Sequence, residues 1–161
     1  MSEETEVQVF DECLQGRISR IGEVLGGLTD EQVNWVPPLT DANSLCVIAT
    51  HALECARSYV FDIACGLDVG RDRPAEFAAK KGVEELRTLA RELGPEIGRA
   101  LAEMDPSRLD FRSVPKQEVW GMGETREISG RWALAHMVEH LSVHVGQMQI
   151  TRDLVLREAG G

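Results

Sequence analysis

The chain has 161 residues and a formal net charge of -10, which is typical of one domain, and we expect a single domain over residues 1–161. This acidic balance, with no clusters of lysine or arginine, argues against nucleic acid or an anionic membrane as a partner. The start MSEETEVQVF has no signal-peptide pattern, and no apolar run reaches the ~20 residues of a membrane span, so we expect a cytoplasmic protein.

The first elements in chain order are helical. We expect a helix over residues 4–25, ended by a pair of glycines. Thr29 has the character of an N-cap and predicts a short helical turn, which the two prolines at 37 and 38 prevent from continuing. The four cysteines occur singly, without a CxxC pair, which predicts buried thiols rather than disulfides or a zinc knuckle.

Two further helices follow. Asn43 or Ser44 is expected to cap the second, which ends near Gly66. The segment GLDVGRDRPAEF is then expected to be a polar connector without regular structure. The third helix is expected over residues 78–104, with a kink or a split at Gly94-Pro95.

The last part of the chain combines a long connection with a long helix. Within residues 105–127 the DFRSV and TREIS pieces alternate in polarity, which predicts a short strand pair near Gly121 and Gly123. Ser129 is expected to cap a fourth helix that extends to about Glu158. Four long amphipathic helices indicate an all-α four-helix bundle.

Three of the four histidines, His136, His140 and His144, recur every four residues in the fourth helix. At about 100° per residue they form a slanting stripe on one side of the helix. An unpaired imidazole inside an apolar face costs free energy unless it forms a hydrogen bond or binds a metal. The apolar residues expected on the same arc are Ala133, Met137, Leu141, Val143, Met148, Leu154 and Val155, and those expected on the other side are Glu139, Ser142, Gln149, Asp153 and Arg157.

The fourth histidine, His51, lies in the second helix among apolar neighbours. Every histidine of the chain is therefore expected on the inward face of one of two helices. This distribution indicates that the histidines assemble one site.

These residues give the chain a resemblance to the DinB-like superfamily, which includes thiol-dependent S-transferases and the maleylpyruvate isomerase N-terminal domain. The pieces that carry it are LTDEQVNWVP, NSLCVIATHALE and HMVEHLSVHVGQ, which together span nearly the whole chain. The resemblance implies a four-helix bundle of up-down-down-up topology, a homodimer, and a divalent metal held by one histidine of the second helix and two of the fourth. In this sequence those ligands are His51, His140 and His144.

Other residues near this site have less certain roles. His136 matches no ligand position of the family, and we expect it to support the ligands by hydrogen bonding. Gln147 is expected either to form hydrogen bonds near the site or to serve helix packing. Cys55 is one turn beyond His51 and is a candidate fourth ligand, although a buried inert thiol is the favoured interpretation. The family often has arginine where this chain has Val145.

Three neutral histidines leave an ion its full charge and an open position, which suits catalysis. Zinc is the first expectation, with nickel, manganese, iron or cobalt as alternatives. Hydrolysis would need a general base, and the sequence shows no inward carboxylate near these histidines except the distant Asp62. We therefore expect a transferase that joins a low-molecular-weight thiol to a small electrophile. The alternatives are a metal-dependent hydrolase and a binding module without turnover.

Overall fold

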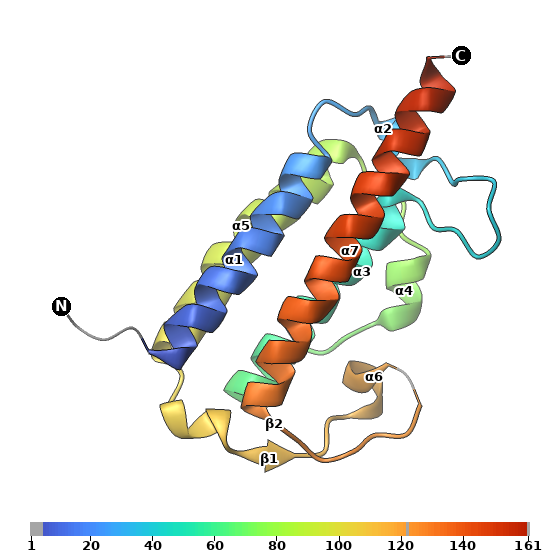
Figure 1. Cartoon of the computed structure of the whole chain (residues 1–161). Coiled ribbons are helices and arrows are strands. Elements are labelled where there is room, and N and C mark those ends of the chain that lie inside the picture. The colour runs from blue at the N-terminus through green and yellow to red at the C-terminus, as the bar shows by residue number, and fades with distance from the viewer. Residues whose placement is uncertain (1–4, 122, 161) are drawn as a thin grey trace.

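Four long helical segments lie side by side in the computed structural model, which describes residues 5–121 and 123–160 (Figure 1). They are α1 (Glu6–Val24), α3 (Leu45–Ser58), α5 (Val83–Glu103) and α7 (Gly130–Ala159). A π-helical turn, η1 (Tyr59–Cys65), extends α3, and a left-handed Gly66 ends it at the predicted place. The predicted all-α bundle is confirmed.

Contacts between the helices establish their directions. Helices α1 and α7 are parallel, since Arg131 pairs with Glu6 near the two starts and Arg17 donates to Ser142 further along. Helix α5 runs the opposite way to α1, because its start at Val83 is bonded to Asp30, just beyond the end of α1. Helix α3 also runs opposite to α7 (Figure 1). The order up-down-down-up is thus confirmed.

Side-chain caps set most of the helix starts. The hydroxyls of Ser44 and Ser129 accept hydrogen bonds from backbone amides of α3 and α7, as predicted. Thr29 caps the short helix α2 (Asp30–Asn34) in the same way. Helix α1 begins after a capping box formed by Thr5, and the predicted start at Glu4 lies outside the described residues.

The predicted connector after Gly66 is partly wrong, because it contains helix α4 (Arg73–Phe77). The side chain of Asp72 caps this helix. The third long helix starts at Val83 rather than near residue 78, because Cys46 holds the intervening backbone: its thiol contacts the carbonyl of Ala79 and the amide of Lys81. Pro95 lies inside α5 without splitting it.

Short elements connect α5 to α7. They are the 3-10 helix η2 (Pro106–Leu109), β1 (Arg112–Ser113), α6 (Gln117–Trp120) and β2 (Ile128–Ser129). The strands pair antiparallel, with Arg112 opposite Ser129, so the predicted strand pair is confirmed. Helix α6 lies between the strands in sequence and was not predicted. It brings Trp120 against Trp132 of α7.

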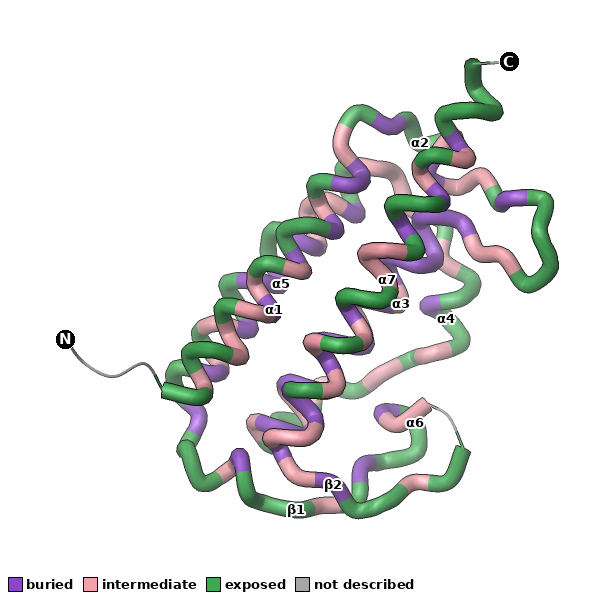
Figure 2. Tube along the Cα trace, in the orientation of Figure 1, coloured by how far each residue is buried: buried purple, intermediate pink, exposed green. Residues whose placement is uncertain are grey.

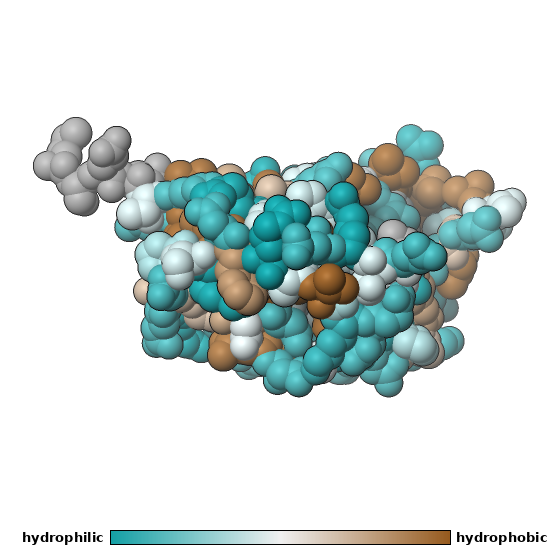
Figure 3. Space-filling view, turned by 90° about the horizontal axis from the view of Figure 1, so that it is seen from below, coloured by the Kyte–Doolittle hydropathy of each residue, from teal (hydrophilic) through white to brown (hydrophobic). Residues whose placement is uncertain are grey.

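The hydrophobic core lies between the four long helices, whose buried residues face inward (Figure 2). Most of the predicted apolar stripe of α7 is buried, and the five polar residues assigned to its other side are exposed. Leu154 is half-buried, and Val143 has 63% of its surface exposed because it lies at the edge of the arc where α7 faces solvent. The end of the molecule that carries the strands is mostly hydrophilic (Figure 3). Among the described residues, no helix has both the length and the apolar character that a membrane span requires.

Candidate metal centre

The structure brings together the three histidines that the family resemblance selects. Because α3 and α7 pack antiparallel, His51 of α3 meets His140 and His144 of α7. The His51 ring centroid lies 5.2 Å from that of His140 and 5.0 Å from that of His144. One nitrogen from each ring lies within 4.8 Å of the other two. Among the described residues, His51, His140 and His144 form the group of histidine, cysteine or carboxylate side chains that is close enough to hold one ion.

Two hydrogen bonds orient these imidazoles. Nδ1 of His51 lies 2.8 Å from Oε2 of Glu76, and Nδ1 of His144 lies 3.0 Å from Oε1 of Gln147. Both partners are acceptors, so in the neutral form of each ring Nδ1 carries the proton and Nε2 keeps its lone pair. A metal ligand needs that lone pair, and a bonded opposite nitrogen is the usual arrangement around bound metals. Gln147 is thus in hydrogen-bond contact with His144, and its role at the site stays a prediction.

His140 has the electrostatic properties of a ligand. Its Nδ1 is buried and has no hydrogen-bond partner among the described residues. Burial, followed by the neighbouring imidazoles, lowers the pKa of His140 to about 3. Burial also lowers the pKa of His144, against the opposing hydrogen bond to Gln147. Neutral imidazoles are the form that binds a divalent ion, and an ion would satisfy the unpartnered nitrogen, so these residues fit a metal.

The sequence analysis missed two buried residues that support His51. Glu76 and Arg71 each have 2% of their side chains exposed. Arg71 donates from Nε to Oε1 of Glu76 at 2.6 Å, and from Nη1 to the carbonyl of Val119 at 2.9 Å. Burial by itself would raise the pKa of Glu76, but the hydrogen bonds from Arg71 and His51 outweigh it and hold the pKa below its usual value.

The inference that Asp62 is the one inward carboxylate near the histidine helices is therefore wrong. Asp72-Arg73-Pro74, a capping residue followed by a proline in the first turn, was the signal that would have placed Glu76 on a helix. Asp62 itself lines a separate hollow with Asp68 and Lys116.

His136 does not belong to the three-histidine group. Its ring stacks on Trp132, with centroids 4.8 Å apart and planes at 20°. The rings of Tyr59 and His140 lie 5.5 and 5.8 Å away. His136 therefore lies against His140 and an aromatic cluster at the same time. Cys55 is also outside the group; burial raises the pKa of its thiol to about 11, as expected of an inert residue.

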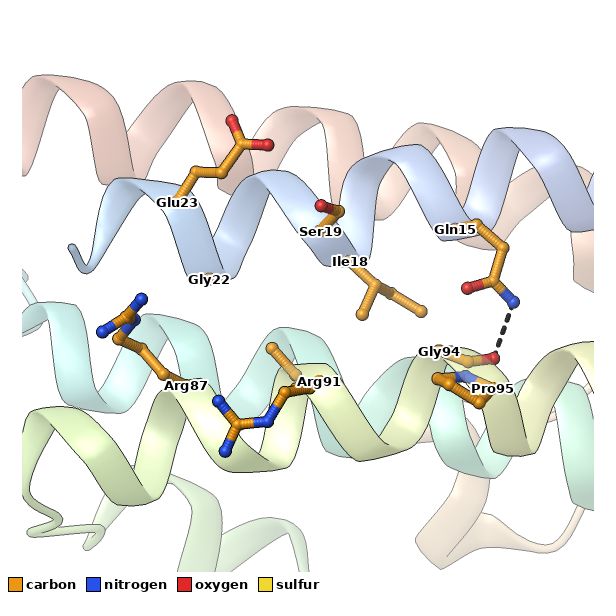
Figure 4. Close-up of a pocket in the computed structure, with 10 residues that line it drawn as sticks. Gln15, Ile18, Ser19, Gly22, Glu23, Arg87, Arg91, Gly94 and Pro95 are labelled. Carbon is orange, nitrogen blue, oxygen red and sulfur yellow. Dashed lines mark hydrogen bonds between the residues drawn. The ribbon is translucent and has the colours of Figure 1, made fainter.

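A groove of about 370 Å³ lies between α1 and α5 (Figure 4). Gln15 of α1 crosses it and donates to the carbonyl of Gly94 at 2.6 Å. Its lining has no histidine or cysteine. The group of described residues that could hold an ion lies on the other pair of helices, α3 and α7.

Comparisons with known proteins identify the family and support the fold. The model of the mycothiol-S-transferase family matches residues 9–156, and the chain belongs to this DinB-like family. No curated protein matches. Among solved structures, a conserved protein from Enterococcus faecalis has a TM-score of 0.68 at 17% identity, covering 96% of this chain and 99% of that one. At this identity the likeness shows a shared fold.

Proposed function

We propose that this member of the mycothiol-S-transferase family joins a low-molecular-weight thiol, mycothiol in the first instance, to a small electrophile. His51, His140 and His144 would hold the divalent ion that the reaction uses, with zinc the first expectation. The observation that carries this proposal is the convergence of three imidazoles from two helices, each with one nitrogen within 4.8 Å of the others. The match to the family supports the thiol chemistry.

Each residue of the site has a separate task in this proposal. A divalent ion, when bound, would lower the pKa of a thiol from its ordinary value of about 8.5 toward neutrality. Glu76 and Gln147 hold the rings of His51 and His144 with Nε2 available. The lowered pKa of His140 keeps its ring neutral at pH 7, ready to act as a ligand.

The state of the nearby acids and nucleophiles favours transfer over hydrolysis. A hydrolase needs a base that accepts a proton from water. Both oxygens of Glu76 accept hydrogen bonds already, and its pKa is lowered, so it is a poor proton acceptor. Burial raises the pKa of Tyr59 to about 12 and that of Cys55 to about 11, so neither supplies a nucleophile at pH 7. The nucleophile would arrive with the thiol substrate.

The test begins with the protein purified without a metal-affinity tag, its metal content measured by elemental analysis, and its activity measured with several thiols, including mycothiol, and 1-chloro-2,4-dinitrobenzene. We expect product that requires both metal and one specific thiol. His140→Ala and His144→Ala should each lose stoichiometric metal and activity while keeping their helical circular dichroism. Glu139→Ala, a change at an exposed position of the same helix, should keep both.

Three results would contradict the proposal. Full metal content in both histidine variants would remove the ligand assignment. Product from an ester or amide panel, with none from the thiols, would make the protein a hydrolase. Metal-dependent ligand binding without product from any panel would make it a binding module.

A further inference from the structure

Two arginines and three aromatic rings border the histidines on the side of α4 and α6, which lie on the same side of α7 in Figure 1. We name this surface the arginine–aromatic rim; it consists of Arg73, Phe77, Trp120, Arg126 and Trp132. It meets the histidines at both ends. The Phe77 ring centroid lies 5.0 Å from that of His51, and the Trp132 ring stacks on His136 at 4.8 Å.

Both guanidinium groups of the rim lie over aromatic rings. Cζ of Arg73 is 4.7 Å from the centroid of Phe77, and Cζ of Arg126 is 4.9 Å from that of Trp132 and 6.0 Å from that of Trp120. Arg73 also reaches the end of α6: Gly121 has a φ of 81°, and a Cβ there would be 3.0 Å from Cδ of Arg73. The two arginines therefore both lie near the segment Trp120-Gly121, although Arg73 precedes it in the sequence and Arg126 follows it.

These two cations lack an acidic partner. Within the described ranges neither Arg73 nor Arg126 forms an ion pair, although the chain carries a net charge of -10. Two neighbouring carboxylates are engaged elsewhere, since Glu76 binds Arg71 and His51, and Glu127 binds Arg112 at 2.8 Å. Uncompensated positive charge at one place on an acidic protein attracts an anion, and the planar guanidinium matches a carboxylate.

The rings of the rim are accessible enough to contact a ligand. Phe77 is 40% exposed, and both tryptophans are half-buried with one side against the core. The indole of Trp132 already has His136, Trp120 and Arg126 against it, so Phe77 is the ring on which a flat, unsaturated group can stack. The rim thus combines two chemical preferences beside the histidines, one for a carboxylate and one for a planar group.

We propose that the electrophile is a planar, unsaturated or aromatic compound that carries a carboxylate, which Arg73 and Arg126 bind while its planar part lies against the exposed ring of Phe77, beside His51. This specificity rests on the proposed transferase function. Arg73 and Arg126 determine which acceptor is used, and they do not take part in the bond changes.

The first experiment measures binding without turnover. The probes are 4-chloro-3-nitrobenzoate and its uncharged analogue 4-chloro-3-nitrobenzamide, followed by the NMR signals of the 15N-labelled tryptophan indoles. It is done in the His144→Ala background, where a carboxylate cannot bind through the metal. The benzoate should bind more tightly than the amide and shift the Trp120 and Trp132 signals. Arg126→Gln and Arg73→Gln should each weaken benzoate binding about fivefold, the effect of losing one exposed ion pair. The matched control Arg99→Gln, at an exposed arginine of α5, should change nothing.

The second experiment measures turnover in the metal-loaded protein with the same probes. In this reaction the S–C bond forms and the C–Cl bond breaks, chloride leaves with the bonding pair, and the thiol proton passes to solvent. Arg126→Gln should raise KM for the benzoate about fivefold with little change in kcat, and leave KM for the amide and for the thiol unchanged.

The outcomes separate this proposal from the transferase function. Equal binding of benzoate and amide, or equal effects of Arg126→Gln and Arg99→Gln, would overturn the acceptor assignment even if thiol transfer is observed. A rise in KM for the thiol instead of the benzoate would also overturn it, because the rim would then be a binding site for the thiol. Selective benzoate binding without any turnover would leave the rim in place and remove the transferase function.

Discussion

The buried pair of Arg71 and Glu76 decides how His51 is presented to the centre of the site. A carboxylate that accepts from Nδ1 fixes the tautomer and makes the opposite nitrogen a stronger ligand. Glu76 keeps its charge in a buried place because Arg71 binds both of its oxygens. The effect on His51 therefore depends on a residue that does not contact it.

Glu76→Gln tests this role, because glutamine has nearly the same shape and no charge. We expect metal affinity to fall about ten- to a hundredfold. The measurement is a competitive metal titration, made at a temperature where circular dichroism shows the variant folded, since Arg71 loses its buried partner. Glu118→Gln, an exposed change on α6, serves as the control and should leave the affinity unaltered. Identical titrations for the two variants would show that Glu76 has no influence on the site.

The lowered pKa of His140 predicts how the stability of the metal-free protein depends on pH. Its pKa is about 3 in the fold, and the ordinary value is 6.5, so the unfolded chain takes up a proton at this residue first as the pH falls. The contribution of His140 to the free energy of unfolding is therefore complete above pH 6.5, and it is lost as the pH falls from 6.5 toward 3. Between pH 7.5 and 5 the loss due to His140 is at most about 2 kcal/mol.

The check is urea denaturation at both pH values, in a chelator, for the wild type and His140→Gln. Glutamine does not titrate, so the variant should lose less stability than the wild type on acidification. Parallel loss in the two proteins would mean that His140 is not the group responsible.

At the level of whole elements, the start of α7 is fixed by close packing as well as by its cap. Gly130 is buried, and a Cβ at this position would overlap the backbone carbonyl of Arg108. Arg108 is itself tied to the end of η1, donating to the carbonyls of Ile63 and Ala64 at 3.0 Å. The helix that carries two of the histidines is thus positioned by backbone contact with η2.

Gly130→Ala should destabilise the protein by about 1–3 kcal/mol, because the backbone of η2 or α7 must move. Gly146→Ala is the matched change on the same helix, where a Cβ meets nothing within 4 Å. It should be stabilising by about 0.5–1 kcal/mol, since alanine favours a helix over glycine. Urea denaturation gives both values, and equal effects of the two substitutions would contradict the packing explanation.

Across the whole molecule, the three histidines connect helices that are distant in the sequence. An ion bound by His51 of α3 and His144 of α7 would cross-link the bundle. It would bind only the folded chain, because unfolding separates these histidines. At a free metal concentration of 100 times Kd, the free energy of unfolding should rise by about 2.7 kcal/mol. Thermal or urea denaturation with and without zinc measures this gain. His144→Ala should show none, and an undiminished gain there would place the ion elsewhere.

The expected homodimer stays a prediction.

The amino-acid sequence was sufficient to predict the four long helices, the cap at Ser129 and the strand pair, with Asn43 or Ser44 as the cap of α3, and the family resemblance implied the up-down-down-up topology. Periodicity and capping depend on residues within a few positions of one another, so they can be recognised without the fold. The spacing of His140 and His144, with the family resemblance, was also sufficient to select the three histidines that converge.

The tertiary structure alone decided the surroundings of that site. Glu76 is 25 residues from His51 in the sequence, and Arg71 is 48 from Val119, so no local pattern shows that they meet. Whether Val143 is covered, and where α6 places Trp120 beside Trp132, depends equally on which segments pack together. Burial and pairing of charged groups are properties of the packed chain, and they set the tautomer, the pKa values and the rim that the sequence left open.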